Sequence, residues 1–139
     1  MNLEDIGSNK EFIDEEITKI ICDSIYHVFG LKAKFENSES KTVEVTIENE
    51  KDQNTFNSIV YKKEKSGVWC NQLMDQCLRA LIKLDKPYKY VVTCVMQQNT
   101  GAPVCSMGGA FFEETDGAVC KTININNMYF SLSIYGLAI

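Results

Sequence analysis

The feature that most constrains the fold is the run of residues 90–112, which contains no charged side chain. An uncharged run of this length raises the question of a membrane-spanning helix. Its centre, however, holds polar and turn-forming residues, namely Gln97, Gln98, Asn99, Thr100, Gly101 and Pro103. Such residues interrupt a helix and mark a turn. The run is therefore predicted to form two strands joined by a turn, with no insertion into a membrane.

One helix is predicted near the start of the chain. Ser8 and Glu11 have the spacing of a capping box, and the acidic residues that follow favour a helix N-terminus. Apolar residues then recur with helical spacing over 13–29. Gly30 has the residue type that ends a helix in a left-handed conformation. A helix ending at residue 29 is therefore expected.

Residues 31–60 are rich in charged side chains, Asn and Ser. Residues 42–47 alternate like a short strand, and residues 49–57 have the composition of a loop. We interpret the whole segment as an elaborated connection that carries a small hairpin or edge strand. Because it lies between two helices, we expect it to be dispensable for folding. A second helix is predicted to start near Ser66, because apolar residues recur with helical spacing over 69–84. It should end at Lys86-Pro87, because the residue before a proline avoids the helical region.

The rest of the chain predicts four strands connected by turns, over 88–96, 104–112, 119–125 and 128–139. The fold class is therefore α+β, with two N-terminal helices packed on a four-stranded antiparallel sheet. Both sets of alternating side chains in the last strand are uncharged, whereas a face exposed to water normally carries charges. Two helices cover only one face, so the residues favour a dimer over a monomer, and exchange of a strand between the two chains is one way to form it.

Composition excludes several classes of function. The chain has 14 basic and 19 acidic residues, a net charge of −5, and no basic stripe, which argues against nucleic acid as a partner. Its first residues also lack the pattern of a secretory signal. The six cysteines form no CxxC motif and no metal-ligand spacing with histidine; they are Cys22, Cys70, Cys77, Cys94, Cys105 and Cys120. We interpret them as reduced core residues of a cytosolic protein, with no metal and no cofactor.

The residue pattern gives little support for a catalytic function. A thiol enzyme would need Cys94 or Cys105 beside His27, the only histidine. His27 falls late on the first predicted helix, where an ordinary, partly exposed histidine explains it. Gly108-Gly109 lacks the spacing of a phosphate-binding loop. We therefore predict that the protein is not an enzyme, and we keep the thiol enzyme as the alternative from another class.

The second predicted strand is the candidate binding element. The side chains at its centre are small and uncharged, and its glycines make the backbone flexible. Another chain could therefore approach closely and add to it as a β-strand. An ordinary inner strand in which the glycines make a bulge explains the same residues. The residues alone leave these two interpretations open. The strand consists of Val104, Cys105, Ser106, Met107, Gly108, Gly109, Ala110, Phe111 and Phe112.

Several short segments have a combination that is specific to one family. They are Trp69, the segment Lys-Pro-Tyr-Lys-Tyr-Val-Val-Thr-Cys at 86–94, Thr-Asp-Gly at 115–117 and the ending Tyr-Gly-Leu-Ala-Ile at 135–139. Together with residues 12–17 they resemble the Tctex-type dynein light chains. The resemblance is missing over 31–60. It implies a single Tctex-type domain over 1–139, with an insertion at about 31–60.

The resemblance implies an αα-ββββ fold that dimerises by exchanging its second strand, in the order 3-4-1-2′. It further implies a non-catalytic dynein light chain that binds the dynein intermediate chain and cargo adaptors by β-strand addition. Such a subunit would act in microtubule-based transport or axonemal motility, in the cytoplasm on the cytoskeleton or in a cilium or flagellum. The groove would comprise residues 104–112, with Trp69 and Gln72 as walls. The alternative is a dynein-independent dimeric adaptor that uses the same groove.

Overall fold

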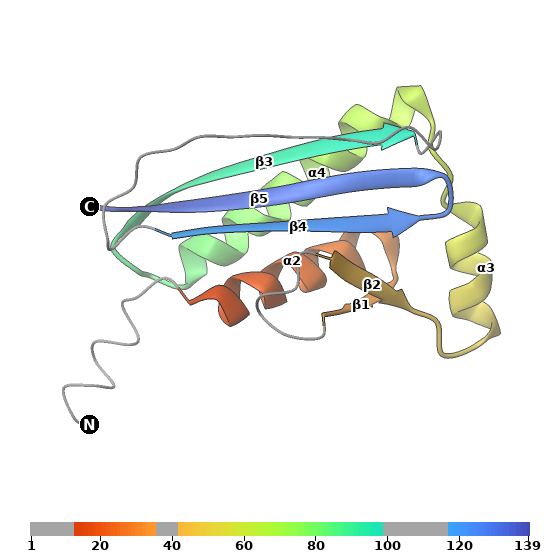
Figure 1. The fold of residues 1–139 in the computed structure, drawn as a ribbon, viewed down its shortest axis with the longest axis horizontal. Coiled ribbons are helices and arrows are strands. Elements are labelled where there is room, and N and C mark those ends of the chain that lie inside the picture. The colour runs from red at the N-terminus through yellow and green to blue at the C-terminus, as the bar shows by residue number, and fades with distance from the viewer. Residues whose placement is uncertain (1–12, 36–41, 99–116) are drawn as a thin grey trace.

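The computed structural model describes residues 13–35, 42–98 and 117–139 (Figure 1). The predicted strand at 104–112 and the predicted cap at Ser8 and Glu11 lie outside these residues. The described helices are α2 (Asp14–Phe29), α3 (Glu50–Ser58) and α4 (Lys63–Lys83). The described strands are β1 (Lys32–Lys34), β2 (Thr42–Thr46), β3 (Tyr88–Gln98), β4 (Gly117–Ile125) and β5 (Met128–Ala138). The predicted α+β class is confirmed.

The two helices expected from apolar periodicity are both present. Gly30 ends α2 with φ 75°, and its main-chain N–H donates a hydrogen bond to the Tyr26 carbonyl at 2.8 Å. The predicted end of that helix is therefore confirmed. Helix α4 begins at Lys63, ahead of the expected start near Ser66. Its buried stripe, Leu73, Cys77 and Leu81, follows the predicted pattern.

The sheet has the strand order β1-β2-β4-β5-β3. Strands β3 and β5 pair antiparallel along their whole length, from Tyr88 opposite Ala138 to Gln98 opposite Met128. Strands β4 and β5 form a hairpin, in which Asn126 and Asn127 make the predicted turn. Three of the four predicted strands are thus confirmed. The prediction of a four-stranded sheet was wrong, because residues 31–60 contribute two further strands.

The segment 31–60 contains more regular structure than its sequence indicates. The expected hairpin is present, with β1 antiparallel to β2. The expected loop at 49–57 is wrong, because residues 50–58 form the helix α3. Asn49 caps this helix by accepting a hydrogen bond from the Asp52 main-chain N–H at 2.9 Å. Helix α3 has no buried residue, so it lacks the apolar periodicity by which a helix is recognised in sequence.

The end of this segment is tied to the β4–β5 turn. The Asn126 side-chain amide donates hydrogen bonds to the carbonyl oxygens of Phe56 and Ile59, the latter at 2.6 Å. Asn127 Oδ1 accepts a hydrogen bond from the Tyr61 main-chain N–H at 2.9 Å. On the other side, β2 pairs in parallel with β4, placing Val43 opposite Ile123. The segment is therefore attached to the sheet both through β2 in its middle and through its last residues.

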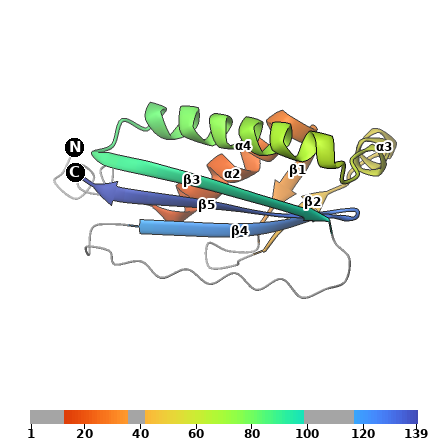
Figure 2. The same cartoon turned by 90° about the horizontal axis from the view of Figure 1, so that it is seen from above.

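Helices α2 and α4 lie together on one face of the sheet formed by β3, β4 and β5 (Figure 2). The core fills the space between these two layers. Alternate residues of β5 point into it and are fully buried: Met128, Phe130, Leu132 and Ile134. Among the described residues, no helix is long and apolar enough to cross a membrane.

Candidate functional site

The two ends of the sheet differ in their capacity to accept another strand. At one end, β1 has only three residues, two of them the exposed lysines Lys32 and Lys34. Short edge strands that carry lysine resist pairing with other chains. At the other end, β3 is 11 residues long, and no described strand pairs with its outer edge. An extended segment would therefore add to the sheet at β3.

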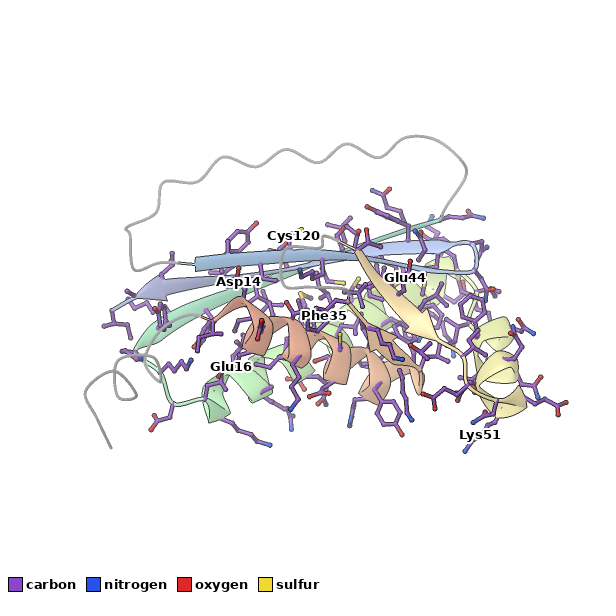
Figure 3. All side chains as sticks on the ribbon, turned by 60° about the horizontal axis from the view of Figure 1, so that its bottom comes forward. Asp14, Glu16, Phe35, Glu44, Lys51 and Cys120 are labelled. Carbon is purple, nitrogen blue, oxygen red and sulfur yellow. The ribbon has the colours of Figure 1, made fainter. Side chains whose placement is uncertain are left out.

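The face of the sheet opposite α2 and α4 is nearly free of charge. Figure 3 shows Cys120 on this side of the sheet, away from α2. Val91 and Val95 of β3 are 46% and 53% exposed there, which is high for large apolar side chains. Lys89 is the one charged residue among the outward positions of β3, β4 and β5. A face with a single charge beside an open edge is suited to contact with another polypeptide.

Trp69 and Gln72 are the predicted site residues that the structure describes. The Trp69 ring is half-buried and packs edge-on against Phe29, with 5.6 Å between centroids and 66° between planes. Gln72 is exposed and lines a cleft of about 220 Å³ with His27 and Val28 of α2. Both residues thus lie on the side of α4 that meets α2. The other predicted site residues, 104–112, lie outside the described part of the chain.

Cys70 is a residue of α4 that contacts the edge strand β3. Its Sγ atom lies 3.2 Å from Cys94 Sγ on β3. Sequence reasoning missed this contact, because no sequence spacing relates residues 70 and 94. Burial is the main cause that raises the pKa of the Cys94 thiol, and the neighbouring Cys70 raises it further. Cys94 therefore stays protonated at neutral pH.

The described residues do not assemble a catalytic thiol. Burial raises the pKa of the Cys77 thiol, which donates a hydrogen bond to Ser24 Oγ at 3.3 Å. In the described part of the chain, no hydrogen bond joins His27 to a cysteine, whereas thiol catalysis relies on such an activating base. Cys105 lies outside these residues. Within the described part of the chain, no group of three or more His, Cys, Asp or Glu side chains is placed to hold a metal ion.

Comparison with known proteins gives a consistent result. The model of the Tctex-1 family matches residues 41–137. A protein of Drosophila melanogaster named "Dynein light chain Tctex-type" is 33% identical over 101 residues, which cover 72% of this chain and 86% of that protein. The human "Dynein light chain Tctex-type 3" is 28% identical over 81 residues, 57% of this chain and 69% of its own. A Dictyostelium discoideum "Dynein light chain Tctex-type" is 26% identical over 97 residues.

Proposed function

Since the chain belongs to the Tctex-1 family, we propose that it is a non-catalytic dynein light chain that acts as a homodimeric peptide clamp. In this proposal it binds a segment of the dynein intermediate chain, or of a cargo adaptor, by β-strand addition. It would serve a cytoplasmic or axonemal dynein on microtubules. Residues 31–60 would be an insertion in a single Tctex-type domain.

The observation that carries the proposal is the long outer edge of β3, which no described strand pairs. The order β4-β5-β3 corresponds to 3-4-1 in the order that the family resemblance implies. In that order the next position belongs to an exchanged strand. Residues 104–112 of a second copy would therefore add to β3, and the bound peptide would add beside them.

The nearly uncharged outer face supports the same arrangement. Val91 and Val95 remain half-exposed, and the outward residues beside them on β5 are Tyr135, Ser133 and Ser131. A second copy that covered this face would remove the exposed half of each valine side chain from water, which contributes roughly 1 kcal/mol for each of them. The proposed dimer thus gains stability from a surface that one chain leaves open.

Strand addition also explains how one small domain could serve more than one partner. Main-chain hydrogen bonds provide affinity that tolerates sequence change, and side-chain pockets provide selectivity. Trp69 and Gln72 lie on the side of α4 that meets α2, so we do not place them at the walls of a groove beside β3. A dimer presents two grooves, so a bivalent partner gains avidity from the high effective concentration of the second site.

Calorimetry and light scattering with a synthetic dynein intermediate-chain segment test the proposal together. We expect a particle of twice the chain mass of 15.7 kDa that binds one peptide in each of two grooves. Gly109→Val should weaken dimerisation or peptide binding, because its side chain needs room beside a neighbouring backbone. The matched control is Gly67→Val on α4, where an added Cβ meets no atom within 4 Å.

The outcomes separate the two binding functions. A dimer that does not bind the intermediate-chain segment at tens of micromolar would contradict the motor-subunit role and favour a dynein-independent adaptor. If Gly109→Val changes neither dimerisation nor affinity, the role given to residues 104–112 is wrong.

A further inference from the structure

Cys70 and Cys94 bring two sulfur atoms together across the interface between α4 and β3. Their Sγ atoms are 3.2 Å apart, and both residues are half-buried. A disulfide bond has a length of about 2.05 Å, so small side-chain movements on each residue would close the gap. The two positions are far apart along the chain, so the contact forms only because α4 packs against β3.

The other described cysteines have different surroundings. Cys77 is fully buried and its sulfur donates to Ser24 Oγ. Cys120 is exposed on the opposite face of the sheet, and its sulfur accepts a hydrogen bond from Ser133 Oγ at 3.1 Å. Cys22 lies on α2. Among the described cysteines, a sulfur-to-sulfur contact therefore joins Cys70 and Cys94 alone.

We propose that Cys70 and Cys94 are an oxidation site, which closes to an intramolecular disulfide by exchange with a small disulfide of the oxidised-glutathione class. The Cys70 thiolate attacks one glutathione sulfur, and the other glutathione leaves and takes up the proton that Cys70 released. The Cys94 sulfur then attacks the Cys70 sulfur of the mixed disulfide, and the second glutathione leaves with the Cys94 proton. Two protein thiols are oxidised, and one glutathione disulfide is reduced to two thiols.

The order of these two attacks follows from the surroundings of Cys94. Burial and the adjacent Cys70 sulfur raise the pKa of the Cys94 thiol, so this thiol is a poor first nucleophile. Once Cys70 carries the mixed disulfide, Cys94 is the adjacent thiol and needs no diffusional encounter. Cys70 is therefore the attacking residue and Cys94 the resolving residue.

The disulfide would connect α4 covalently to the strand at the open edge of the sheet. Closing the loop between residues 70 and 94 restricts the unfolded chain, which stabilises the folded state. We expect the thermal midpoint of the oxidised protein to lie roughly 5 to 10 °C above that of the reduced protein. This inference does not depend on the proposed binding function, because thiol content and stability report it directly.

The test uses the full chain, treated with oxidised glutathione and then alkylated under denaturing conditions. Of the six thiols of the sequence, those of residues 70 and 94 should be lost, and peptide mapping should link these two residues within one chain, whereas the exposed Cys120 can carry only a mixed disulfide with glutathione. A thiol reductant should restore both the thiols and the lower midpoint. Cys70→Ser, Cys70→Ala and Cys94→Ser should each abolish the linkage, whereas Cys120→Ser, the control, should still lose two thiols.

Circular dichroism under reducing conditions first shows that each variant folds. If one of the two Cys70 variants does not fold, the other is sufficient to test the role of Cys70. The inference is overturned if six thiols persist after oxidation. It is equally overturned if the linkage joins other cysteines or two chains, or if glutathione stays attached to Cys70. A linkage between residues 70 and 94 that leaves the midpoint unchanged would overturn the stabilising role.

Discussion

Lys86 Nζ lies 3.0 Å from Glu16 Oε2, and this ion pair joins the first turn of α2 to the residues that lead into β3. The Lys86 side chain is 6% exposed and that of Glu16 is 30% exposed. Both residues belong to segments that carry the family resemblance. Burial, followed by Glu16 and Tyr88, raises the pKa of Tyr90 in the same motif. These motif residues therefore hold α2 against the start of the edge strand.

Glu16→Gln should destabilise the fold, because it removes the charge that faces the largely buried Lys86 ammonium. We expect the free energy of unfolding to fall by about 1–2 kcal/mol, measured by urea denaturation at neutral pH. Glu15→Gln is the control, since Glu15 is an exposed neighbour in the same helical turn. Equal losses in the two variants would show that the ion pair contributes nothing.

Val43→Ala tests whether the segment 31–60 is part of the core. The sequence alone predicts a dispensable segment, but the Val43 side chain is 1% exposed and β2 pairs with β4. We expect a loss of about 2 kcal/mol in the free energy of unfolding. Ile47→Ala, at a 39% exposed residue just after β2, should cost much less. An unchanged stability of the Val43 variant would support dispensability.

Lys32→Val with Lys34→Val should convert β1 into an edge that accepts other strands. The double substitution also removes the ion pair between Lys32 Nζ and Glu48 Oε2, which are 3.4 Å apart. Because this pair is exposed, its loss should change stability little. We expect association beyond the size of the unmodified protein that increases with concentration, measured by light scattering. Lys63→Val with Lys65→Val removes the same charge from exposed positions of α4 and should not have this effect.

Val95→Glu should weaken the proposed dimer, because it places a charge on the outer face beside the open edge. Sedimentation should show the mass falling toward that of one chain, 15.7 kDa. Ile82→Glu is the matched control, since Ile82 is 72% exposed on α4 and lies in the helical layer. If both variants keep the mass of the unmodified protein, the outer face is not the contact between copies.

Stability should decrease at alkaline pH in part through Cys22. Burial, assisted by Asp23 and opposed by Lys121, raises the pKa of this thiol from 9.0 to about 11. The unfolded chain therefore releases this proton first, and the stabilising contribution is lost as the pH rises through about 9 to 11. Urea denaturation in a reducing buffer should show a shallower decline for Cys22→Ala than for the unmodified protein. Identical slopes would contradict the assignment.

Local patterns in the sequence were sufficient for most of the elements. Helices α2 and α4 have an apolar stripe, and β3 and β5 alternate, because each of them buries one face against the same core. The near absence of charge from the outer face was also visible in sequence, since alternation assigns side chains to faces. Helix α3 could not be predicted in this way, because none of its side chains is fully buried and its cap at Asn49 resembles an ordinary polar loop.

The sequence by itself determined helices α2 and α4, strands β3, β4 and β5, and the near absence of charge on the outer face, since these depend on periodicity within a few residues. The tertiary structure decided which elements meet. It placed β2 parallel to β4, Lys86 beside Glu16, Gln72 toward α2 and Cys70 against Cys94. Each of these contacts joins residues that are distant in the chain. Their free energy depends on how whole layers pack, which no local spacing encodes.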